Sequence, residues 1–253
     1  MLIVKSPVEK TIKLENNIIL LKVYAPEISS TIKPGQFLNI LVSDSYSPLL
    51  RRPFSVCDIE GDFIFLMFNI LGEGTKILAQ KLKGETINIL GPLGHGFNIE
   101  GDYNTAVIVA GGLGAAPFPY FVRALPKNKK NISFVGGKNS NDVITYGLNN
   151  ILVSTDDGTL GYKGTVIGLL SENLDLLKQD KIKIFACGPN PMLKALKEFT
   201  LINNFECEVS IESAMACGFG ICQGCPVEST NTKDKYSLVC KDGPVFNVKD
   251  IVL

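Results

Sequence analysis

Several features that would assign a function are scarce in this sequence. Lys and Arg together number 25, as do Asp and Glu, so no surplus of positive charge suits the chain to nucleic acid or anionic lipid. No run approaches the ~18 apolar residues of a membrane-spanning helix. The N-terminus carries no secretion signal, because Met1 to Val4 is followed at once by Lys5 and polar residues. We therefore expect a compact cytoplasmic protein that binds neither nucleic acid nor membranes.

Tryptophan is absent, which excludes nothing, and histidine occurs once, as His95. Cysteine occurs seven times. An odd number without a secretion signal favours free thiols in a reducing cytosol over a disulfide framework. The 253 residues are enough for two or three small domains. The cysteines therefore need an explanation other than cross-linking.

Four of the cysteines gather near the C-terminus with a distinctive spacing. Three follow the pattern C-x4-C-x2-C and the last comes after a longer gap: Cys217, Cys222, Cys225 and Cys240. This spacing is typical of a [2Fe–2S] cluster of the plant ferredoxin type, which is held by four thiolates. Gly218, Gly220 and Gly224 let the backbone wrap tightly where a Cβ would clash. The pattern predicts a one-electron carrier.

A structural zinc site is the alternative for these cysteines. Zinc motifs usually present two C-x2-C pairs, or cysteine together with histidine. Here only Cys222 and Cys225 have that spacing, and His95 is far away in the sequence. The spacing favours iron–sulfur over zinc, and a zinc-stabilised binding module stays open as a rival interpretation.

The first hundred residues read as short strands separated by Gly, Pro and Asn turns. Apolar stretches predict strands at Ile18–Tyr24, Gln36–Val42, Phe54–Ile59, Phe63–Phe68 and Thr86–Leu90. Asn16-Asn17 and Glu60-Gly61-Asp62 are typical of hairpin connections. One helix is predicted near Lys76–Leu82. Many short strands with a single helix indicate an antiparallel β-barrel.

From about residue 104 to 211 the pattern changes to alternating strands and helices. Buried strands are predicted at Val107–Ala110, Ile132–Val135, Ile151–Val153, Ile182–Ala186 and Glu206–Ile211, with helices at Val166–Leu177 and Pro191–Thr200. This alternation is the signature of a parallel, doubly wound sheet. We expect three domains: a barrel over 1–100, an α/β domain over 101–211 and a small cysteine-bearing domain over 212–253.

Two segments of the predicted barrel suit a cofactor that carries phosphate. In Arg51-Arg52-Pro53-Phe54-Ser55 a guanidinium can bind phosphate and the hydroxyl of Ser55 can reach a flat ring. Gly72-Glu73-Gly74-Thr75 runs into the predicted helix, whose N-terminus offers N–H groups to a pyrophosphate. Each has an ordinary alternative: a solvated arginine pair, and a glycine turn capped by Thr75.

The predicted sheet carries a glycine-rich turn in the context of a dinucleotide site. Strand Val107–Ala110 runs into Gly111-Gly112-Leu113-Gly114-Ala115-Ala116-Pro117 and then a helix. Pro117 stands in place of the third glycine of the usual fingerprint, and no acidic residue is clearly placed to bind a ribose. Glycines at this turn still allow the backbone to approach phosphates closely.

A second turn of the sheet contains Cys187-Gly188-Pro189. It follows a predicted strand at the edge where ligands bind in open α/β sheets. Asn190 is predicted to cap the next helix and Pro191 to begin it. The alternative for Cys187 is a small buried apolar residue, which is also what we expect of Cys57 and Cys207.

Taken together, these motifs resemble one family. Their order along the whole chain is similar to that of the ferredoxin–NADP⁺ reductase superfamily, and within it to the electron transfer subunits of type B dihydroorotate dehydrogenase. The most specific segments are Glu212-Ser-Ala-Met-Ala-Cys217-Gly-x-Gly-x-Cys222-x-x-Cys225, Thr155-Asp156-Asp157-Gly158-x-x-Gly161-Tyr162-Lys163-Gly164 and Cys240-Lys-Asp-Gly243-Pro244-Val-Phe246. Phe54 departs from the family, in which Ile is more usual.

The resemblance implies FAD, NAD and a [2Fe–2S] cluster as cofactors. It implies FAD contacts at Arg52, Pro53, Phe54, Ser55, Asn69, Ile70, Leu71, Gly74 and Thr75, and nicotinamide-cofactor contacts at Gly111, Gly112, Gly114, Cys187, Gly188 and Pro189. It implies that Cys217, Cys222, Cys225 and Cys240 hold the cluster. It also implies Ser55 and Cys187 as catalytic residues.

The resemblance implies a function as well. A partner subunit with FMN would oxidise dihydroorotate, and the electrons would pass through the cluster and FAD to NAD⁺ during the synthesis of the pyrimidine nucleotide UMP. The implied assembly is a heterotetramer with two copies of each subunit. An apolar patch at Phe219–Ile221 is expected to dock the partner. The alternative is delivery of electrons from NAD(P)H to another partner, such as a glutamate-synthase-like flavoprotein, a sulfide dehydrogenase or a hydrogenase.

Overall fold

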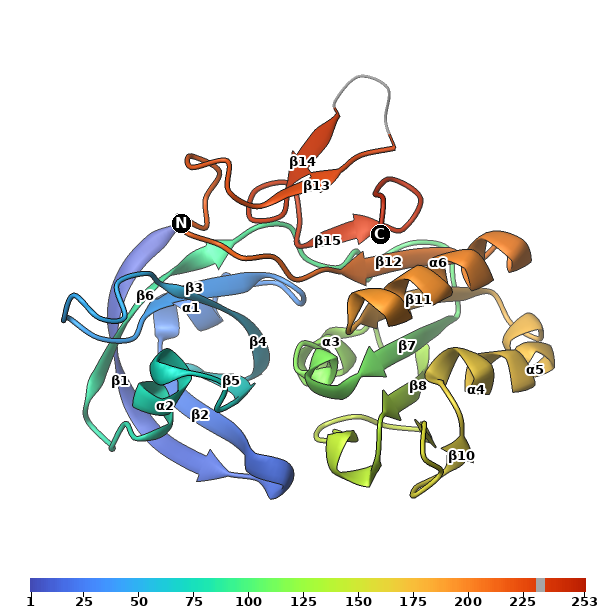
Figure 1. The fold of residues 1–253 in the computed structure, drawn as a ribbon, viewed down its shortest axis with the longest axis horizontal. Coiled ribbons are helices and arrows are strands. Elements are labelled where there is room, and N and C mark those ends of the chain that lie inside the picture. Colours follow the sequence, from blue (N-terminus) through green and yellow to red (C-terminus); the bar gives the residue numbers. More distant parts are fainter. Residues whose placement is uncertain (231–234) are drawn as a thin grey trace.

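The computed structural model describes residues 1–230 and 235–253 of the chain. Its N-terminal part is a closed antiparallel barrel with the strand order β1-β2-β5-β4-β3-β6 (Figure 1). The strands are β1 (Leu2–Lys13), β2 (Ile18–Tyr24), β3 (Phe37–Leu41), β4 (Arg52–Glu60), β5 (Phe63–Asn69) and β6 (Thr86–Leu93). Short helices α1 (Pro26–Ser29) and α2 (Glu73–Ala79) and the 3-10 turn η1 (Glu15–Asn17) lie between them. The predicted barrel is confirmed.

The barrel hairpins form where the turn residues predict them. Asn16 and Asn17 both adopt φ 59° between β1 and β2, and Gly61 adopts φ 56° between β4 and β5. Asn and Gly tolerate this left-handed region better than other residues, which is why they mark such turns. The predicted helix near Lys76–Leu82 is wrong in its bounds. It starts earlier, at Glu73, because Thr75 Oγ1 accepts hydrogen bonds from the N–H groups of Leu71 and Gly72 at 3.0 and 3.2 Å.

The second part of the chain is a sheet with helices on both faces. Its strand order is β10-β9-β8-β7-β11-β12-β15, and all its pairs are parallel except that of β12 with β15. The strands are β7 (Thr105–Gly111), β8 (Lys130–Gly137), β9 (Ile151–Thr155), β10 (Tyr162–Lys163), β11 (Ile182–Cys187), β12 (Glu206–Ser210) and β15 (Val245–Asn247). The chain first builds outward from β7 through β8 and β9, and then returns to β11. The strand order therefore reverses between β7 and β11, where ligands bind in such sheets.

The helices of this part are α3 (Phe118–Ala124), α4 (Val166–Glu172), α5 (Leu174–Lys178) and α6 (Asn190–Asn203), with 3-10 turns η2 (Gly112–Ala115) and η3 (Ser140–Asp142). Two predicted details are corrected. The single helix over Val166–Leu177 is broken at Asn173, which has non-helical φ −103° and ψ 17°. Helix α6 already includes Asn190, and Pro189 occupies the N-cap, so the predicted capping by Asn190 is wrong by one residue.

The core explains how the barrel and the sheet are held together. Phe97, on the segment that leaves the barrel, packs against Phe118, Phe121 and Phe185 of the sheet domain, with ring centroids 5.4 to 5.7 Å apart. Phe118, Phe121 and Phe185 are fully buried. Aromatic burial of this extent is a large apolar contribution at one place. It fixes the angle between the two parts and so the cleft that separates them.

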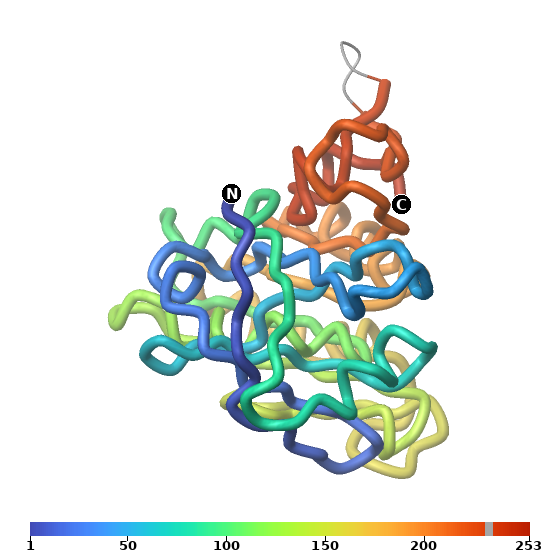
Figure 2. The backbone as a smooth tube through the Cα atoms, turned by 90° about the vertical axis from the view of Figure 1, so that its left-hand side faces the viewer, coloured from blue at the N-terminus to red at the C-terminus, as the bar shows by residue number. Residues whose placement is uncertain are grey.

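The C-terminal segment lies over both other parts, as Figure 2 shows in red. It contains the hairpin β13 (Pro226–Glu228) and β14 (Tyr236–Leu238), and then β15, which joins the edge of the sheet beside β12. His95 N–H donates to Gly243 O at 2.5 Å, so the segment is also tied to the end of the barrel. Within residues 1–230 and 235–253, no helix is long and apolar enough to cross a membrane.

Candidate functional site

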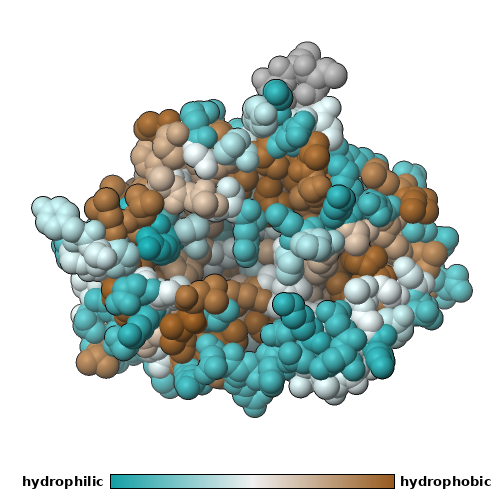
Figure 3. Space-filling model, viewed as in Figure 1, coloured by the Kyte–Doolittle hydropathy of each residue, from teal (hydrophilic) through white to brown (hydrophobic). Residues whose placement is uncertain are grey.

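A cleft of about 260 Å³ separates the barrel from the sheet. Barrel residues form one wall, the strand ends of the sheet form the opposite wall, and the segment after β12 closes one side. The lining residues of the barrel are Phe37, Pro53, Phe54, Ser55, Met67, Phe68, Asn69, Leu71 and Thr75; those of the remainder are Leu113, Ala116, Pro117, Cys187, Ser210, Ile211, Glu212, Ser213, Met215 and Pro244. The wall is mostly apolar with a few polar groups, as small-molecule sites usually are. Figure 3 shows the molecule hollowed at this place.

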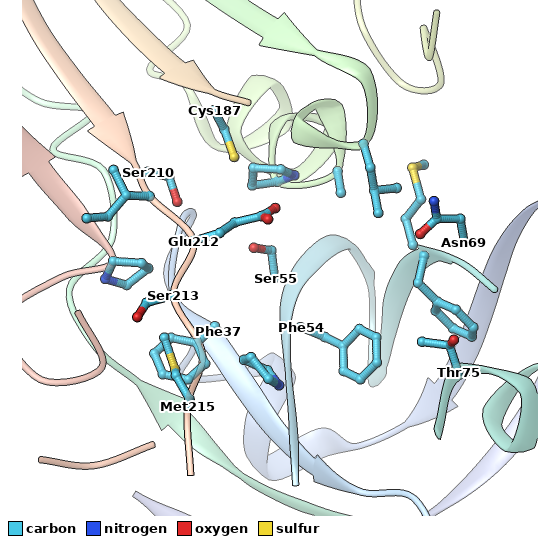
Figure 4. A pocket seen from close by; sticks show the side chains of 18 of the residues that line it. Phe37, Phe54, Ser55, Asn69, Thr75, Cys187, Ser210, Glu212, Ser213 and Met215 are labelled. Carbon is cyan, nitrogen blue, oxygen red and sulfur yellow. The ribbon is translucent and has the colours of Figure 1, made fainter. Parts of the chain in front are cut away.

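The residues after β3 and β5 approach this cleft in different ways. Phe54 and Ser55 lie on β4, and Figure 4 shows Ser55 aimed toward Glu212 across the cleft. Arg52 does not line the cleft; it covers Gly74, at which a Cβ would lie 3.3 Å from the Arg52 Nε. Ile70 is exposed to solvent beside the lining residues Asn69 and Leu71. The structure thus brings together nearly all the predicted barrel residues around one opening.

Arg51 differs from its neighbour. Its guanidinium donates to Asn39 O and Asn88 O, both at 3.1 Å, and to Asn88 Oδ1 at 2.7 Å. Partial burial lowers the pKa of Arg51 from its usual value. Arg51 therefore fastens β3 to β6, and it is not a free cation for a phosphate group.

Cys187 ends strand β11 and faces the cleft together with Ser210 and Glu212 (Figure 4). Burial raises the pKa of the Cys187 thiol to about 12, the charge of Glu212 adds to this, and a hydrogen bond with Ser210 opposes it. The thiol therefore stays neutral at physiological pH. A neutral, buried thiol beside an exposed carboxylate can orient a ring and donate or accept a hydrogen bond, but it is a poor nucleophile.

A second cavity of about 480 Å³ opens at the carboxyl ends of the strands. It is lined by Gly111, Gly112, Gly136, Gly137, Lys138, Asp142, Asp156, Thr165, Val166, Ile167, Pro189, Pro191, Met192 and Ala195. The cavity combines a glycine turn with the start of α6, at the place where the strand order reverses. This is the arrangement that a dinucleotide requires.

Two of the predicted glycines act differently from Gly111 and Gly112. Gly114 packs on the backbone of β11, where a Cβ would lie only 2.2 Å from Cys187 O. Gly188 lines a smaller hollow that also includes Glu212 and Ser213. The Cys187-Gly188-Pro189 turn therefore joins the cleft to the second cavity, because Cys187 lines the first and Pro189 lines the second.

The four C-terminal cysteines form two pairs. Cys217 Sγ accepts a hydrogen bond from the Cys222 N–H at 3.5 Å, and Cys225 Sγ accepts one from the Cys240 N–H at 3.4 Å. Gly218 and Gly220 adopt φ 82° and 92°, so the loop needs residues without a Cβ, as predicted. All seven cysteines are free thiols, and Cys57 and Cys207 are buried as expected.

The donor chemistry of these pairs suits an iron–sulfur group. Burial opposes ionisation of Cys217, but backbone N–H donors from Cys222, Phe219 and Ile221 outweigh it and lower its pKa to about 6. Burial and the neighbouring Cys225 raise the pKa of Cys240 to about 12. N–H groups aimed at sulfur favour the thiolate form that binds metals.

A single zinc ion fits the cysteines less well. Across residues 1–230 and 235–253, no three His, Cys, Asp or Glu side chains converge as a site for one metal ion. Structural zinc needs four ligands around one point, whereas a [2Fe–2S] cluster has two irons and takes ligands as two pairs. The arrangement in two pairs therefore fits the larger group.

The cysteine loop begins beside the cleft. Met215 lines the cleft, and two residues later Cys217 begins the loop, so their Cα atoms are within about 7 Å. Phe219 and Ile221 on the loop are 37% and 75% exposed. Figure 3 shows apolar surface where this loop lies, at the upper left of the view.

Sequence reasoning missed four residues of these two cavities: Ser210 and Glu212 in the cleft, and Asp142 and Asp156 in the second cavity. Glu212 could have been found, because it follows strand β12, the neighbour of the strand that carries Cys187. Asp142 and Asp156 follow β8 and β9, whose carboxyl ends meet at the same edge. The missing signal was the order of the strands.

Comparisons with known proteins agree on one family. Residues 212–252 match the family model of the iron–sulfur cluster binding domain of dihydroorotate dehydrogenase B. The dihydroorotate dehydrogenase B (NAD(+)) electron transfer subunit of Caldanaerobacter subterraneus is 38% identical over 223 residues, which cover 87% of each chain. The protein of the same name from Fusobacterium nucleatum is 33% identical over 256 residues and covers 96% of each chain.

Solved structures show the same fold. A chain of an NADH-dependent reduced ferredoxin–NADP oxidoreductase superposes with a TM-score of 0.83 at 24% identity, covering 98% of this chain and 89% of the other. A ferredoxin NADP⁺ reductase from Neisseria gonorrhoeae, with bound FAD and NADP, gives a TM-score of 0.66 at 17% identity and covers 81% of this chain and 92% of the other. The barrel, the doubly wound sheet and their order are common to all of them.

Proposed function

The chain belongs to the family of electron transfer subunits of NAD(+)-dependent dihydroorotate dehydrogenase B, and from this premise we propose how its residues serve the activity. The expectation of this family from the sequence motifs is confirmed. The chain is an oxidoreductase component that uses FAD, NAD and an iron–sulfur cluster. Nicotinamide transfers two electrons as a hydride, the cluster takes one at a time, and a flavin exchanges electrons with both.

The cleft carries this proposal, because it borders both ends of such a chain of carriers. Cys187 joins it to the glycine-lined cavity, and Met215 joins it to the cysteine loop two residues away. A flat ring held in the cleft would therefore lie between the two. No general acid or base needs to act on dihydroorotate here, so the partner subunit must supply that chemistry.

In the cleft we assign the flavin to the barrel residues that surround it. The residues proposed to bind FAD are Arg52, Pro53, Phe54, Ser55, Asn69, Ile70, Leu71, Gly74 and Thr75. Ser55 is proposed to hydrogen-bond the edge of the ring, since its hydroxyl faces the cleft. Cys187 is proposed to orient the nicotinamide from the opposite wall. Both roles are positional, consistent with a thiol that stays neutral.

The second cavity is proposed to bind the rest of NAD. Gly111, Gly112 and Pro189 would approach its phosphates, while Gly114 and Gly188 shape the turns beneath. Cys217, Cys222, Cys225 and Cys240 are proposed as the cluster ligands. Three domains, over 1–100, 101–211 and 212–253, are proposed to divide these tasks, although β15 of the third domain pairs with β12 of the second.

The family name implies a catalytic partner subunit. We propose that it contains FMN and oxidises dihydroorotate in pyrimidine synthesis in the cytoplasm, within a heterotetramer of two copies of each subunit. The exposed side chains of Phe219 and Ile221 support docking near the cysteine loop. Apolar residues at the centre of an interface, close to a redox group, suit electron transfer between subunits.

Cofactor content tests this proposal. Purified without oxygen, the chain is expected to be brown, with one FAD and one two-iron cluster for each chain and the absorption bands of both. Metal analysis and flavin release measure this directly. A colourless protein that holds zinc and no flavin would overturn the proposal and favour the binding module instead.

A further inference from the structure

Strand β3 connects the flavin cleft to the cysteine loop. Phe37 and Asn39 lie on the same face of this strand, because side chains alternate along a strand. Phe37 lines the cleft, and Asn39, about 7 Å further along the strand, contacts the loop. The same step is made by the other segment, in which Met215 lines the cleft and Cys217 begins the loop. Two adjacent segments therefore run from the cleft to the loop.

Asn39 is the contact between these segments. Its Nδ2 donates a hydrogen bond to Cys217 O at 3.1 Å, across 178 positions of sequence. The side chain is fully buried. Its own backbone is fixed on both sides, because Asn39 pairs with Pro53 on β4 and its carbonyl accepts from Arg51. The donor is therefore held by the part of the barrel that carries the proposed flavin residues.

The loop is shaped to receive this side chain. Gly218 follows Cys217, has φ 82°, and would place a Cβ only 2.4 Å from Asn39 Nδ2 and 3.2 Å from its Cγ. Any other residue at this position would push the amide away. The loop backbone is thus seated on Asn39 by a hydrogen bond and by direct packing at the first cysteine.

Stability alone does not account for an asparagine here. Asn39 Oδ1 is buried and has no hydrogen-bond partner among the described residues. A buried polar atom without a partner costs free energy, so an apolar side chain of similar shape would suit the barrel core better. The amide is therefore retained for its donor, which serves only Cys217.

We propose that Asn39 is a positioning residue that anchors the cysteine loop to the flavin barrel and so fixes the cluster relative to the flavin cleft. The inference rests on the proposed function, because it assigns the loop to a cluster. It predicts that the barrel sets the loop geometry even before a cluster is bound.

Two variants of Asn39 test this inference. Asn39→Leu removes the donor and the unpartnered oxygen while keeping the size, and Asn39→Asp removes the donor alone. In protein stripped of iron, amide hydrogen exchange at residues 215–222 is expected to rise about tenfold in both variants, the size of effect that loss of one hydrogen bond allows. In the loaded protein, the electron paramagnetic resonance spectrum and the midpoint potential of the cluster are expected to shift, while reduction of flavin by NADH keeps its rate.

The matched control is Asn131→Leu on β8, because Asn131 also has a buried amide atom without a partner but lies in the sheet. It should change neither exchange at residues 215–222 nor the cluster spectrum. If the Asn39 variants fail to fold, Gly218→Ala displaces the same contact from the loop side and should raise exchange equally. Native exchange and a native spectrum in the folded variants would overturn the inference. Absence of any cluster in the unaltered protein would instead overturn the proposed function.

Discussion

Cys222→Ser is expected to abolish the [2Fe–2S] signal of the protein while leaving its reduction by NADH intact. A hydroxyl is a poor substitute for a thiolate at an iron site. Cys222 is exposed, so the change removes a ligand without opening the core. The flavin cleft and the glycine-lined cavity contain no part of this side chain. Transfer of electrons to the partner should fail because the one-electron carrier is gone.

The measurement is the paramagnetic spectrum of the reduced protein, together with the rate of flavin bleaching by NADH. Cys57→Ser is a control of the same chemical change, because Cys57 is buried in β4 away from the loop. The control should keep the cluster. A Cys222→Ser protein with an unaltered [2Fe–2S] signal would remove Cys222 from the ligand set.

Gly114→Ala is expected to destabilise the protein more than any other single methyl group that we consider. Its Cβ would lie 2.2 Å from Cys187 O and 2.5 Å from Cys187 C, and backbone atoms of a central strand have little room to move. Overpacking of this kind costs about 2–3 kcal/mol, which lowers Tm by roughly 5–10 °C in a chain of this size. Relief of the clash would also shift Cys187, so hydride transfer from NADH should slow.

Thermal unfolding followed by circular dichroism measures the first effect. Gly72→Ala is the matched control, because Gly72 has extended backbone at φ −158° and a Cβ there would meet nothing within 4 Å. Its Tm should stay within about 2 °C of the native value, as for most surface substitutions. Equal Tm values for the two variants would show that the turn and β11 are not in the close contact described.

The periodicity of apolar residues predicted most strands because their buried faces are continuous. It missed β1, whose exposed residues alternate lysine and glutamate with apolar ones over Leu2–Lys13. This strand is held by its neighbours β2 and β6 on both sides, and pairing of that kind leaves little trace in the local sequence. Helix bounds failed where a cap decided them, as at Thr75.

The site was predictable where motifs are local and not where the chain must fold to assemble it. The four cysteines, Ser55 and the glycine turn are recognisable from a few adjacent residues. Asn39 and Cys217 are 178 positions apart, and only strand pairing brings them together. Asp142 and Asp156 become neighbours through the order of β8 and β9. The sequence motifs therefore indicate which groups are bound, while the topology decides how they are placed.

Reconstitution with the partner subunit tests the central claim most directly. The chain alone is expected to oxidise NADH with an artificial acceptor and to show no oxidation of dihydroorotate. Addition of the catalytic subunit should produce dihydroorotate oxidation coupled to reduction of NAD⁺, followed as NADH absorbance. Dihydroorotate turnover by the isolated chain, or a mixture that never reduces NAD⁺, would contradict the assignment of this chain as the electron transfer subunit.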